Sequence, residues 1–467
     1  MSHYLIYTSL IYTNAPPHVG HLYELVVANS LCECLKNWYN VKLAIGADDH
    51  GAKIQNCSKL KAVSATKISN LNSNKLLSLC SKYEINVKDW TSTSYPKHVN
   101  LVKNRLCTAK FCKATRKSNY CGWYSPQLDC YCSSDEVRFE KNLMYCVTNV
   151  PTEWTEEQAI FLNVYNLKCM LFALFRARLI RAPFISDNFI LENVRLLEDV
   201  CITRSKTVNY GIKVITKQSK LTLWVWIDAI LAYTKVEDAH KVHIVGKDIT
   251  KFHLTHYIIL SILCNSRLPK IIVQHSYITA SQVKISKSLG NQPTSVDFQA
   301  IWIYYYLSTR PLKNDLKLTK PALSAAANKL INNVGNLAKR LIKLLKLYRP
   351  KLSKLTISDW ITVTYIKQLE AVLKYLAKSF KLNEINNITL DGTTKVNSLI
   401  SNYKLWRNTY ANHKVFIYSF VTKKYIKWLK HSIGNTAKLI VQNMQNTNTN
   451  YTPFLKNNNK IINQQQS

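Results

Sequence analysis

Alternating runs of apolar and polar positions near the start of the chain predict a strand, a helix and a second strand. Residues 3–9 are rich in β-prone side chains and are followed by a turn at Pro16-Pro17. From His21 to Trp38 apolar positions recur at helical spacing, and residues 41–45 form an apolar run that ends at Gly46. This order is typical of a βαβ unit, in which ligands lie at the carboxyl ends of the strands.

Similar patterns return later in the chain. Apolar segments at 221–233 and 242–246 precede a predicted helix at 249–263 and a predicted strand at 270–273. The intervening residues 110–200 differ in character, because aromatic and cysteine side chains cluster there. We therefore expect an α/β protein whose parallel sheet is built from two halves separated by an insertion.

From about residue 320 the pattern becomes helical and basic. Leu330, Val334 and Leu337 recur at helical spacing, and further helices are predicted at 360–380 and 410–441. The last residues are rich in Asn and Gln and are expected to be disordered. The predicted domains are two halves of a sheet domain (1–109 and 201–279), the insertion (110–200), a loop with the region after it (280–329), a helical bundle (330–442) and a tail (443–467).

The net charge narrows the class of partner. Lys and Arg total 63 against 27 Asp and Glu, a formal charge of +36. Such a charge favours a polyanion through phosphate contacts and counterion release, although part of it is compositional drift in a chain rich in Lys, Asn, Ile and Tyr. No apolar stretch is long enough to span a bilayer, and the first predicted strand begins too early for a targeting segment. We expect a cytoplasmic protein with a nucleic-acid partner and no membrane partner.

The thirteen cysteines are scattered, and no Cys-x-x-Cys pair occurs. They are expected to be reduced thiols, most of them packed as small apolar side chains. One group has a spacing that could suit a metal: Cys121, Cys130, Cys132 and Cys146. Because Cys-x-x-Cys pairs are missing, a structural zinc is not expected.

Two short motifs carry candidate chemistry. His18-Val19-Gly20-His21 stands where a helix is predicted to begin, a position suited to anions, and its glycine leaves room for phosphate and base. Lys284-Ile285-Ser286-Lys287-Ser288 places two lysines on a predicted loop that can close over a triphosphate. Taken alone, the first motif would more often be a surface or capping pair, and the second an ordinary basic loop.

In this order the two motifs resemble the ATP-binding signatures of class I aminoacyl-tRNA synthetases, and the run at 12–21 resembles the methionyl-tRNA synthetases among them. The resemblance covers about residues 4–440. It implies a Rossmann-like parallel-sheet catalytic domain with a connective insertion, followed by an all-α anticodon-binding bundle. It also implies an activity: methionine is activated with ATP to methionyl-adenylate and pyrophosphate, and is then transferred to the 3′ end of its tRNA.

The resemblance implies site residues as well. His18, His21, Lys284 and Lys287 would act by positioning and charge stabilisation, with Lys287 the main stabiliser of the departing phosphates. ATP, which enters with Mg²⁺, would be bound by His18, Gly20, His21, Gly246, Asp248, Lys284, Lys287 and Ser288. Methionine would occupy a soft apolar and aromatic pocket with one carboxylate for its ammonium group, formed by Leu10, Tyr12, Asp48, Trp226, Ala229, Tyr233, Ile249 and His253.

In the helical domain the resemblance assigns anticodon reading to Asn336, Arg340 and Trp406. Amide and guanidinium groups suit the edges of unpaired bases, and an aromatic face suits stacking. The expected partners are the initiator and elongator methionine tRNAs, and the protein is expected to be a monomer.

The chain also departs from the family pattern. Ser276 stands where a glycine is usual, and Ile11 and Ile230 stand where proline is common. These changes are expected to affect backbone position near the adenine and local rigidity.

The family has a strand at the positions of Val225–Ala229, and we expect a strand there.

Two alternatives stay open. Synthetases for leucine, isoleucine and valine carry a large editing insertion, for which 110–200 is too short, and a cysteine enzyme would need a zinc-binding Cys near Ser9 and Leu10. The other alternative is a catalytically inactive tRNA-binding protein. Against it stand the intact His18, His21, Asp48, Lys284 and Lys287.

Overall fold

The computed structural model describes most of the chain up to residue 340. The described residues are 3–36, 38–125, 130–132, 137–140, 143–146, 150–204, 208–215, 220–235, 238–280, 283–284, 300–337, 340, 375, 379, 384, 387, 391 and 394. They fall into two compact units, of which unit 1 comprises residues 1–297 and 311–318, and unit 2 comprises residues 298–310 and 319–467.

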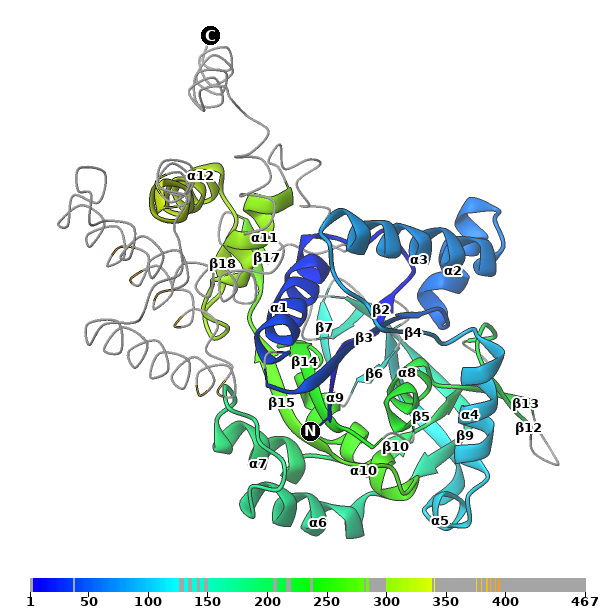
Figure 1. Ribbon diagram of the computed structural model, residues 1–467. Coiled ribbons are helices and arrows are strands. Elements are labelled where there is room, and N and C mark those ends of the chain that lie inside the picture. Colours follow the sequence, from blue (N-terminus) through cyan, green and yellow to red (C-terminus); the bar gives the residue numbers. More distant parts are fainter. Residues whose placement is uncertain are drawn as a thin grey trace, which may run out of the picture. The chain divides into compact units, whose positions relative to one another are not determined.

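A parallel sheet forms the centre of unit 1 (Figure 1). Its strands follow the order β15-β14-β1-β3, the short β2 and β4 both pair with β3, and every pairing is parallel. Most of the apolar side chains on these strands are buried, as expected for a sheet covered on both faces. The strands are β1 (His3–Thr8), β2 (Ile11–Tyr12), β3 (Asn40–Asp48), β4 (Asp89–Ser92), β14 (His240–Gly246) and β15 (Pro269–His275).

Helices pack on this sheet through apolar side chains. The 17-residue helix α1 (Val19–Leu35) contacts β1, β3 and β14, and most of its residues from Leu22 onward are buried. The predicted strand, helix and strand at the start of the chain are therefore confirmed. The other helices of this part are α2 (Ala52–Lys61), α3 (Ala65–Lys82), α4 (Pro96–Leu106), α8 (Val225–Leu231), the 3-10 turn η2 (Ala232–Thr234), α9 (Thr250–Leu254) and α10 (His256–Leu263).

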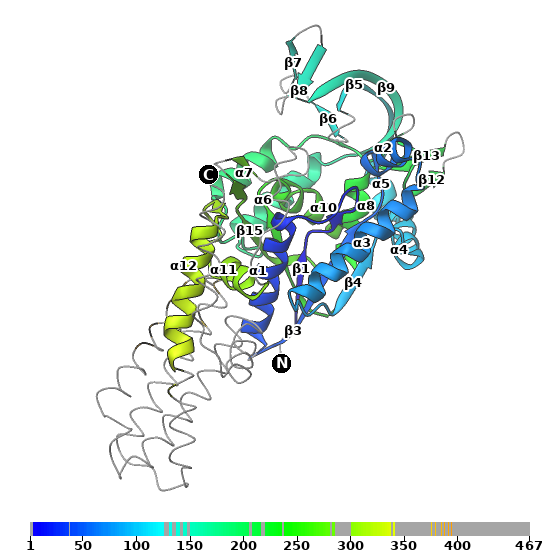
Figure 2. The ribbon, with the colours of Figure 1, turned by 90° about the horizontal axis from the view of Figure 1, so that it is seen from above.

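The region expected to differ in character builds a separate, antiparallel sheet. Its strands follow the order β6-β5-β9-β8-β7, with β10 paired to β9. Figure 2 shows strands β5 to β9 at one end of unit 1. The elements here are α5 (Ala109–Lys113), β5 (Thr115–Ser125), β6 (Cys130–Cys132), β7 (Val137–Glu140), β8 (Leu143–Cys146), β9 (Pro151–Leu162), α6 (Tyr165–Arg176), α7 (Asp187–Arg195) and β10 (Val200–Cys201).

Two small sheets complete unit 1. One follows the order β11-β13-β12 and leads into α8, and the other follows the order β17-β16-β18 and includes the start of the second motif. Their strands are β11 (Thr203–Arg204), β12 (Lys213–Ile215), β13 (Lys220–Leu223), β16 (Ile278–Ala280), β17 (Val283–Lys284) and β18 (Leu316–Lys317).

Unit 2 is helical where it is described. Helix α11 (Ala300–Ser308) packs against α12 (Lys320–Leu330), which continues into the π-helical turn η3 (Ile331–Gly335). The helices expected at 360–380 and 410–441 and the tail lie outside the described residues, apart from isolated positions. Over the described part of the chain, no helix combines the length and apolar character that crossing a bilayer requires.

One expectation about local structure is wrong, and another is confirmed except at one residue. Val225–Ala229 is not a strand but part of α8, where the Ile227 and Asp228 N–H groups donate to the Trp224 carbonyl at 3.0 and 3.2 Å. The helix expected at 249–263 is divided at Thr255 into α9 and α10. The segment at 225–229 is buried on nearly every side, and periodicity does not distinguish a strand from a helix in such an apolar run.

Replacing Ile244 by Ala should lower the free energy of unfolding by about 2–5 kcal/mol, because Ile244 lies fully buried in β14 and its loss leaves a cavity. Ile215→Ala is the matched control: this side chain is 79% exposed, so the change should stay within about 0.5 kcal/mol. Urea denaturation measures both. Equal losses in the two variants would contradict the placement of the core.

Candidate active site

A cavity of about 640 Å³ opens where the carboxyl ends of β1, β3 and β14 meet. Parallel pairing brings these strand ends to one edge of the sheet, although they are far apart in the sequence. Thirteen residues that the sequence assigned to ATP or methionine line the cavity: Leu10, Tyr12, His18, Gly20, His21, Asp48, Trp226, Ala229, Tyr233, Gly246, Asp248, Ile249 and His253.

His18 and His21 stand at the start of α1. His18 is the N-cap: its Nδ1 accepts from the Gly20 N–H at 3.0 Å, and His21 Nδ1 accepts from the His18 N–H at 3.1 Å. The two rings stack with their centroids 3.8 Å apart. Because both Nδ1 atoms accept, the proton of each neutral imidazole lies on Nε2. Two ring N–H donors at a helix N-terminus make an arrangement suited to a phosphate group.

Close contacts favour glycine at two positions of the site. A Cβ on Gly20 would lie 2.8 Å from the His18 ring, and a Cβ on Gly246 would lie 2.8 Å from Asp248 Oδ1. At Ser276, where the family has glycine, a side chain is accommodated, because the buried hydroxyl donates to the Asn314 carbonyl. This departure therefore leaves no hydroxyl unsatisfied beside the cavity.

The part of the cavity lined by residues of α8, η2 and α9 is aromatic and neutral. The Tyr233 hydroxyl accepts from the Leu10 N–H at 2.9 Å and donates to the Thr8 carbonyl at 3.3 Å, which fixes the chain after β1. The Trp226 ring stacks on Phe252 at 4.2 Å. Burial lowers the pKa of His253 to about 4, so this imidazole is uncharged at neutral pH. A pocket of this kind suits an apolar, polarisable side chain such as a thioether.

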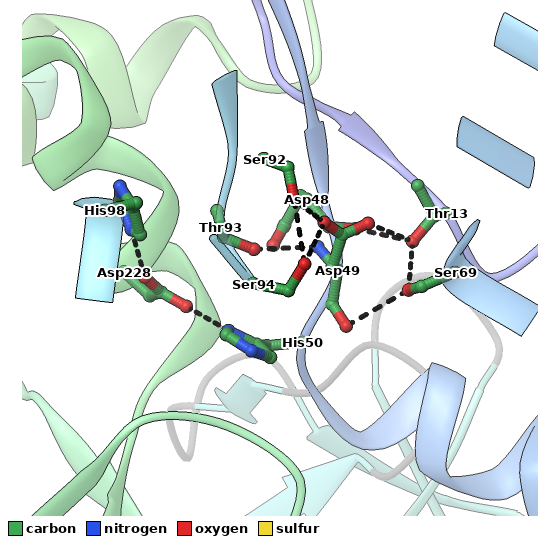
Figure 3. Close-up of polar contacts among 10 residues, drawn as sticks. All are labelled: Thr13, Asp48, Asp49, His50, Ser69, Ser92, Thr93, Ser94, His98 and Asp228. Carbon is green, nitrogen blue, oxygen red and sulfur yellow. Dashed lines mark hydrogen bonds and ion pairs between the residues drawn. The ribbon is translucent and has the colours of Figure 1, made fainter. Parts of the chain in front are cut away.

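Asp48 reaches the cavity from the end of β3, and its neighbour Asp49 faces a group of hydroxyls instead (Figure 3). The Asp49 carboxylate accepts from Thr13 at 3.0 Å, from Ser94 at 3.1 Å and from Ser92. The Thr13 N–H and hydroxyl also bond to the Asp48 carbonyl. These contacts fix the backbone on which the Asp48 side chain is carried.

Three residues that the sequence did not single out as a unit form a buried relay behind the cavity wall (Figure 3). Asp228 accepts from His50 Nδ1 and from His98 Nε2, each at 2.6 Å. Burial alone would raise the pKa of Asp228, but the hydrogen bonds and charges of both histidines hold it below its ordinary value. Burial would lower the pKa of His50, yet the bond to Asp228 and the charges of Asp228 and Asp49 raise it.

A second buried pair, also missed from the sequence, lines the cavity near α1. Glu24 accepts from the Ser9 N–H and hydroxyl through Oε1 and contacts His275 Nε2 through Oε2 at 3.0 Å. His275 Nδ1 meets the Ser276 carbonyl at 2.9 Å. Burial would lower the pKa of His275, but the hydrogen bond and charge of Glu24, the Ser276 carbonyl and Asp248 raise it above its ordinary value. Flanked by two acceptors, this imidazole favours the charged form.

Several assigned residues are not brought to the cavity by the described structure. Lys284 ends β17, and only its backbone is described, while Lys287, Ser288 and Trp406 lie outside the described residues. Asn336 and Arg340 are exposed and helical in unit 2, so their assignment to the anticodon stays a prediction.

The cysteines between residues 121 and 146 lie on the antiparallel sheet. Cys121 is exposed on β5, whereas Cys132 on β6 and Cys146 on β8 are buried. Within the described residues, no three His, Cys, Asp or Glu side chains are grouped to hold a metal ion. The side chain of Cys130 is outside that set, so the expectation about zinc stays a prediction.

A family profile and individual relatives both relate this chain to the same group of enzymes. A profile of the family described as "tRNA synthetases class I (M)" matches residues 4–141 and 139–342. The "Methionine–tRNA ligase" of Rickettsia conorii is 26% identical over 421 residues, which cover 85% of this chain and 80% of that protein. The enzyme of the same name from Rhizobium meliloti is 26% identical over 368 residues, 74% of this chain and 71% of that protein. The "Probable methionine–tRNA ligase, mitochondrial" of Neurospora crassa is 25% identical over 386 residues, and the chain spans 60% of its length.

A solved structure shares the fold. The Mycobacterium tuberculosis methionyl-tRNA synthetase in complex with methionyl-adenylate superposes with a TM-score of 0.85 at 22% identity, covering 94% of this chain and 93% of that one. The expected α/β architecture is therefore confirmed.

The raised pKa of His275 predicts how Glu24 contributes to stability. A group whose pKa is raised by folding stabilises most below its unfolded pKa of about 6.5 and loses that contribution as pH rises through the folded pKa. Glu24→Gln removes the carboxylate beside His275. The resulting loss in the free energy of unfolding, relative to the natural chain, should be larger at about pH 6 than at about pH 9. Chemical denaturation at both pH values measures this. A loss that is constant or grows with pH would contradict a charged His275.

Proposed function

The chain belongs to the family of class I tRNA synthetases (M), and on that premise we propose that it is a methionine–tRNA ligase. A methionine carboxylate oxygen attacks the α-phosphorus of ATP, the bond to the β-phosphate breaks, and pyrophosphate leaves. A hydroxyl of the terminal tRNA ribose then attacks the carbonyl carbon of the adenylate, and AMP leaves. Mg²⁺ enters with ATP as part of the substrate.

One observation supports this proposal above the others: a single cavity holds both a phosphate-binding helix start and a neutral aromatic pocket with a carboxylate at its edge. In this proposal His18 and His21 would face the phosphates and Asp248 would bind the ribose hydroxyls, and all three line the cavity. Asp48 would hold the methionine ammonium group while Trp226 and His253 enclose the side chain. The reaction then proceeds by orientation and charge stabilisation.

The same arrangement argues against a protein that only binds tRNA. Binding tRNA requires positive charge on an accessible surface, whereas the paired imidazoles at the start of α1 lie in a cavity of small-molecule size. The +36 charge is consistent with either reading and does not distinguish them. We further infer that the initiator and elongator methionine tRNAs are the partners, that the anticodon is read by Asn336, Arg340 and Trp406, and that the enzyme acts as a monomer in the cytoplasm.

Lys287→Ala should lower the rate of methionine-dependent ATP–pyrophosphate exchange by about 10²–10³-fold, because the variant lacks a cation for the charge that develops on the phosphates. Lys117→Ala, at an exposed position of β5, is the control and should leave the rate unchanged. Circular dichroism checks that both variants fold. An undiminished rate in folded Lys287→Ala would remove this lysine from the mechanism.

Trp406→Ala should leave pyrophosphate exchange intact but weaken tRNA charging by about 1–3 kcal/mol, the typical contribution of one stacked base. Tyr375→Ala serves as the control, since this aromatic ring of unit 2 is 66% exposed and has no assigned role. Aminoacylation of methionine tRNA measures the difference. The same loss in both variants would count against anticodon stacking on Trp406.

A further inference from the structure

We propose that Asp228 is a positioning residue that fixes the wall of the methionine pocket relative to Asp48. This inference rests on the proposed function, because it treats the cavity as a methionine site. It assigns a task to the relay of Asp228, His50 and His98, none of which lines the cavity.

The relay joins three elements that are distant in the sequence. Asp228 lies on α8, His98 lies on α4, and His50 follows the end of β3. Each carboxylate oxygen of Asp228 accepts from a different imidazole at 2.6 Å, and the Asp228 side chain is 1% exposed. Two short directional bonds from one carboxylate set the distances between these elements more narrowly than apolar packing does.

Both ends of the relay lead directly into the cavity. On α8, Trp226 and Ala229 line the pocket, and Asp228 stands between them in the sequence behind the wall. On the other side, His50 is two residues from Asp48, which lines the cavity. Asp48 is therefore connected to the wall residue Ala229 through two residues of chain, the hydrogen bond between His50 and Asp228, and one further residue.

The remaining contacts of this segment support a positioning task. Asp49 is held by Thr13, Ser92 and Ser94, so the residues after Asp48 are fixed on two sides (Figure 3). In His98, Nδ1 has no hydrogen-bond partner among the described residues and is buried. Nε2, which donates to Asp228, is therefore the ring atom through which this side chain is held.

The two ring atoms used by the relay predict which amide can replace each histidine. The amide nitrogen of Asn can take the place of Nδ1, and that of Gln can take the place of Nε2. His98→Gln and His50→Asn therefore keep the donor to Asp228, whereas His98→Asn and His50→Gln misplace it. Each pair differs by one methylene group and serves as its own control.

The test measures KM for methionine and KM for ATP in pyrophosphate exchange. We expect KM for methionine to rise by about tenfold or more in Asp228→Asn, His98→Asn and His50→Gln, since losing a hydrogen bond to a buried charged group typically changes an equilibrium constant by about that factor. KM for ATP should change by less than about twofold, because the relay joins elements that carry residues assigned to methionine. A mere loss of folded protein would lower kcat and leave both KM values unchanged. KM for methionine should be clearly closer to the value of the natural chain in His98→Gln than in His98→Asn. It should likewise be closer in His50→Asn than in His50→Gln. Asp238→Asn, with a side chain that is 97% exposed, should change neither constant.

Each outcome decides one question. Silence of the natural chain with methionine would overturn the proposed function and this inference together. Exchange with methionine but an unchanged methionine KM in folded variants, or an equal rise in both KM values, would overturn the inference alone. Equal behaviour of His98→Gln and His98→Asn would also overturn it, and this pair decides the question if Asp228→Asn does not fold.

Discussion

A charged group that is buried must be paired, and at the end of β3 this requirement organises the site. Three consecutive residues leave the strand in different directions: Asp48 toward the cavity, Asp49 toward a group of hydroxyls, and His50 toward Asp228. An unpaired buried polar group costs about 1–3 kcal/mol, and a charge costs more. The partners of Asp49 and His50 remove that cost and fix the backbone from which Asp48 reaches the ligand.

The residues that line the cavity supply two chemical environments. Near α1 the groups are ionic or donate hydrogen bonds: Glu24 with His275, and the stacked His18 and His21. On the side of α8 and α9 the groups are aromatic and neutral, and burial keeps His253 uncharged. A triphosphate and a thioether need these opposite surroundings, and a parallel sheet provides both because its strand ends converge at one edge.

The sequence predicted the features that depend on local pattern. Apolar runs and helical spacing were enough for β1, α1 and β3, and the motif at 18–21 indicated the start of α1. The segment at 225–229 was assigned wrongly to a strand from the resemblance alone, and a run buried on nearly all sides carries no periodic signal that could correct this. The pairs of Asp228 with His50 and of Glu24 with His275 were missed. Their members stand 178 and 251 residues apart, and only the folded chain shows that they meet. A buried acid within an apolar run, such as Asp228, was the available signal.

The central claim is that this cavity activates methionine. The most direct test is ATP–pyrophosphate exchange by the purified chain with each of the twenty amino acids in turn, without tRNA. Exchange that depends on methionine alone is the predicted result, because it requires the anion-binding helix start, the carboxylate of Asp48 and the neutral pocket to act on one substrate. Exchange with a different amino acid, or none with any of the twenty from folded protein that still binds tRNA, would contradict the claim.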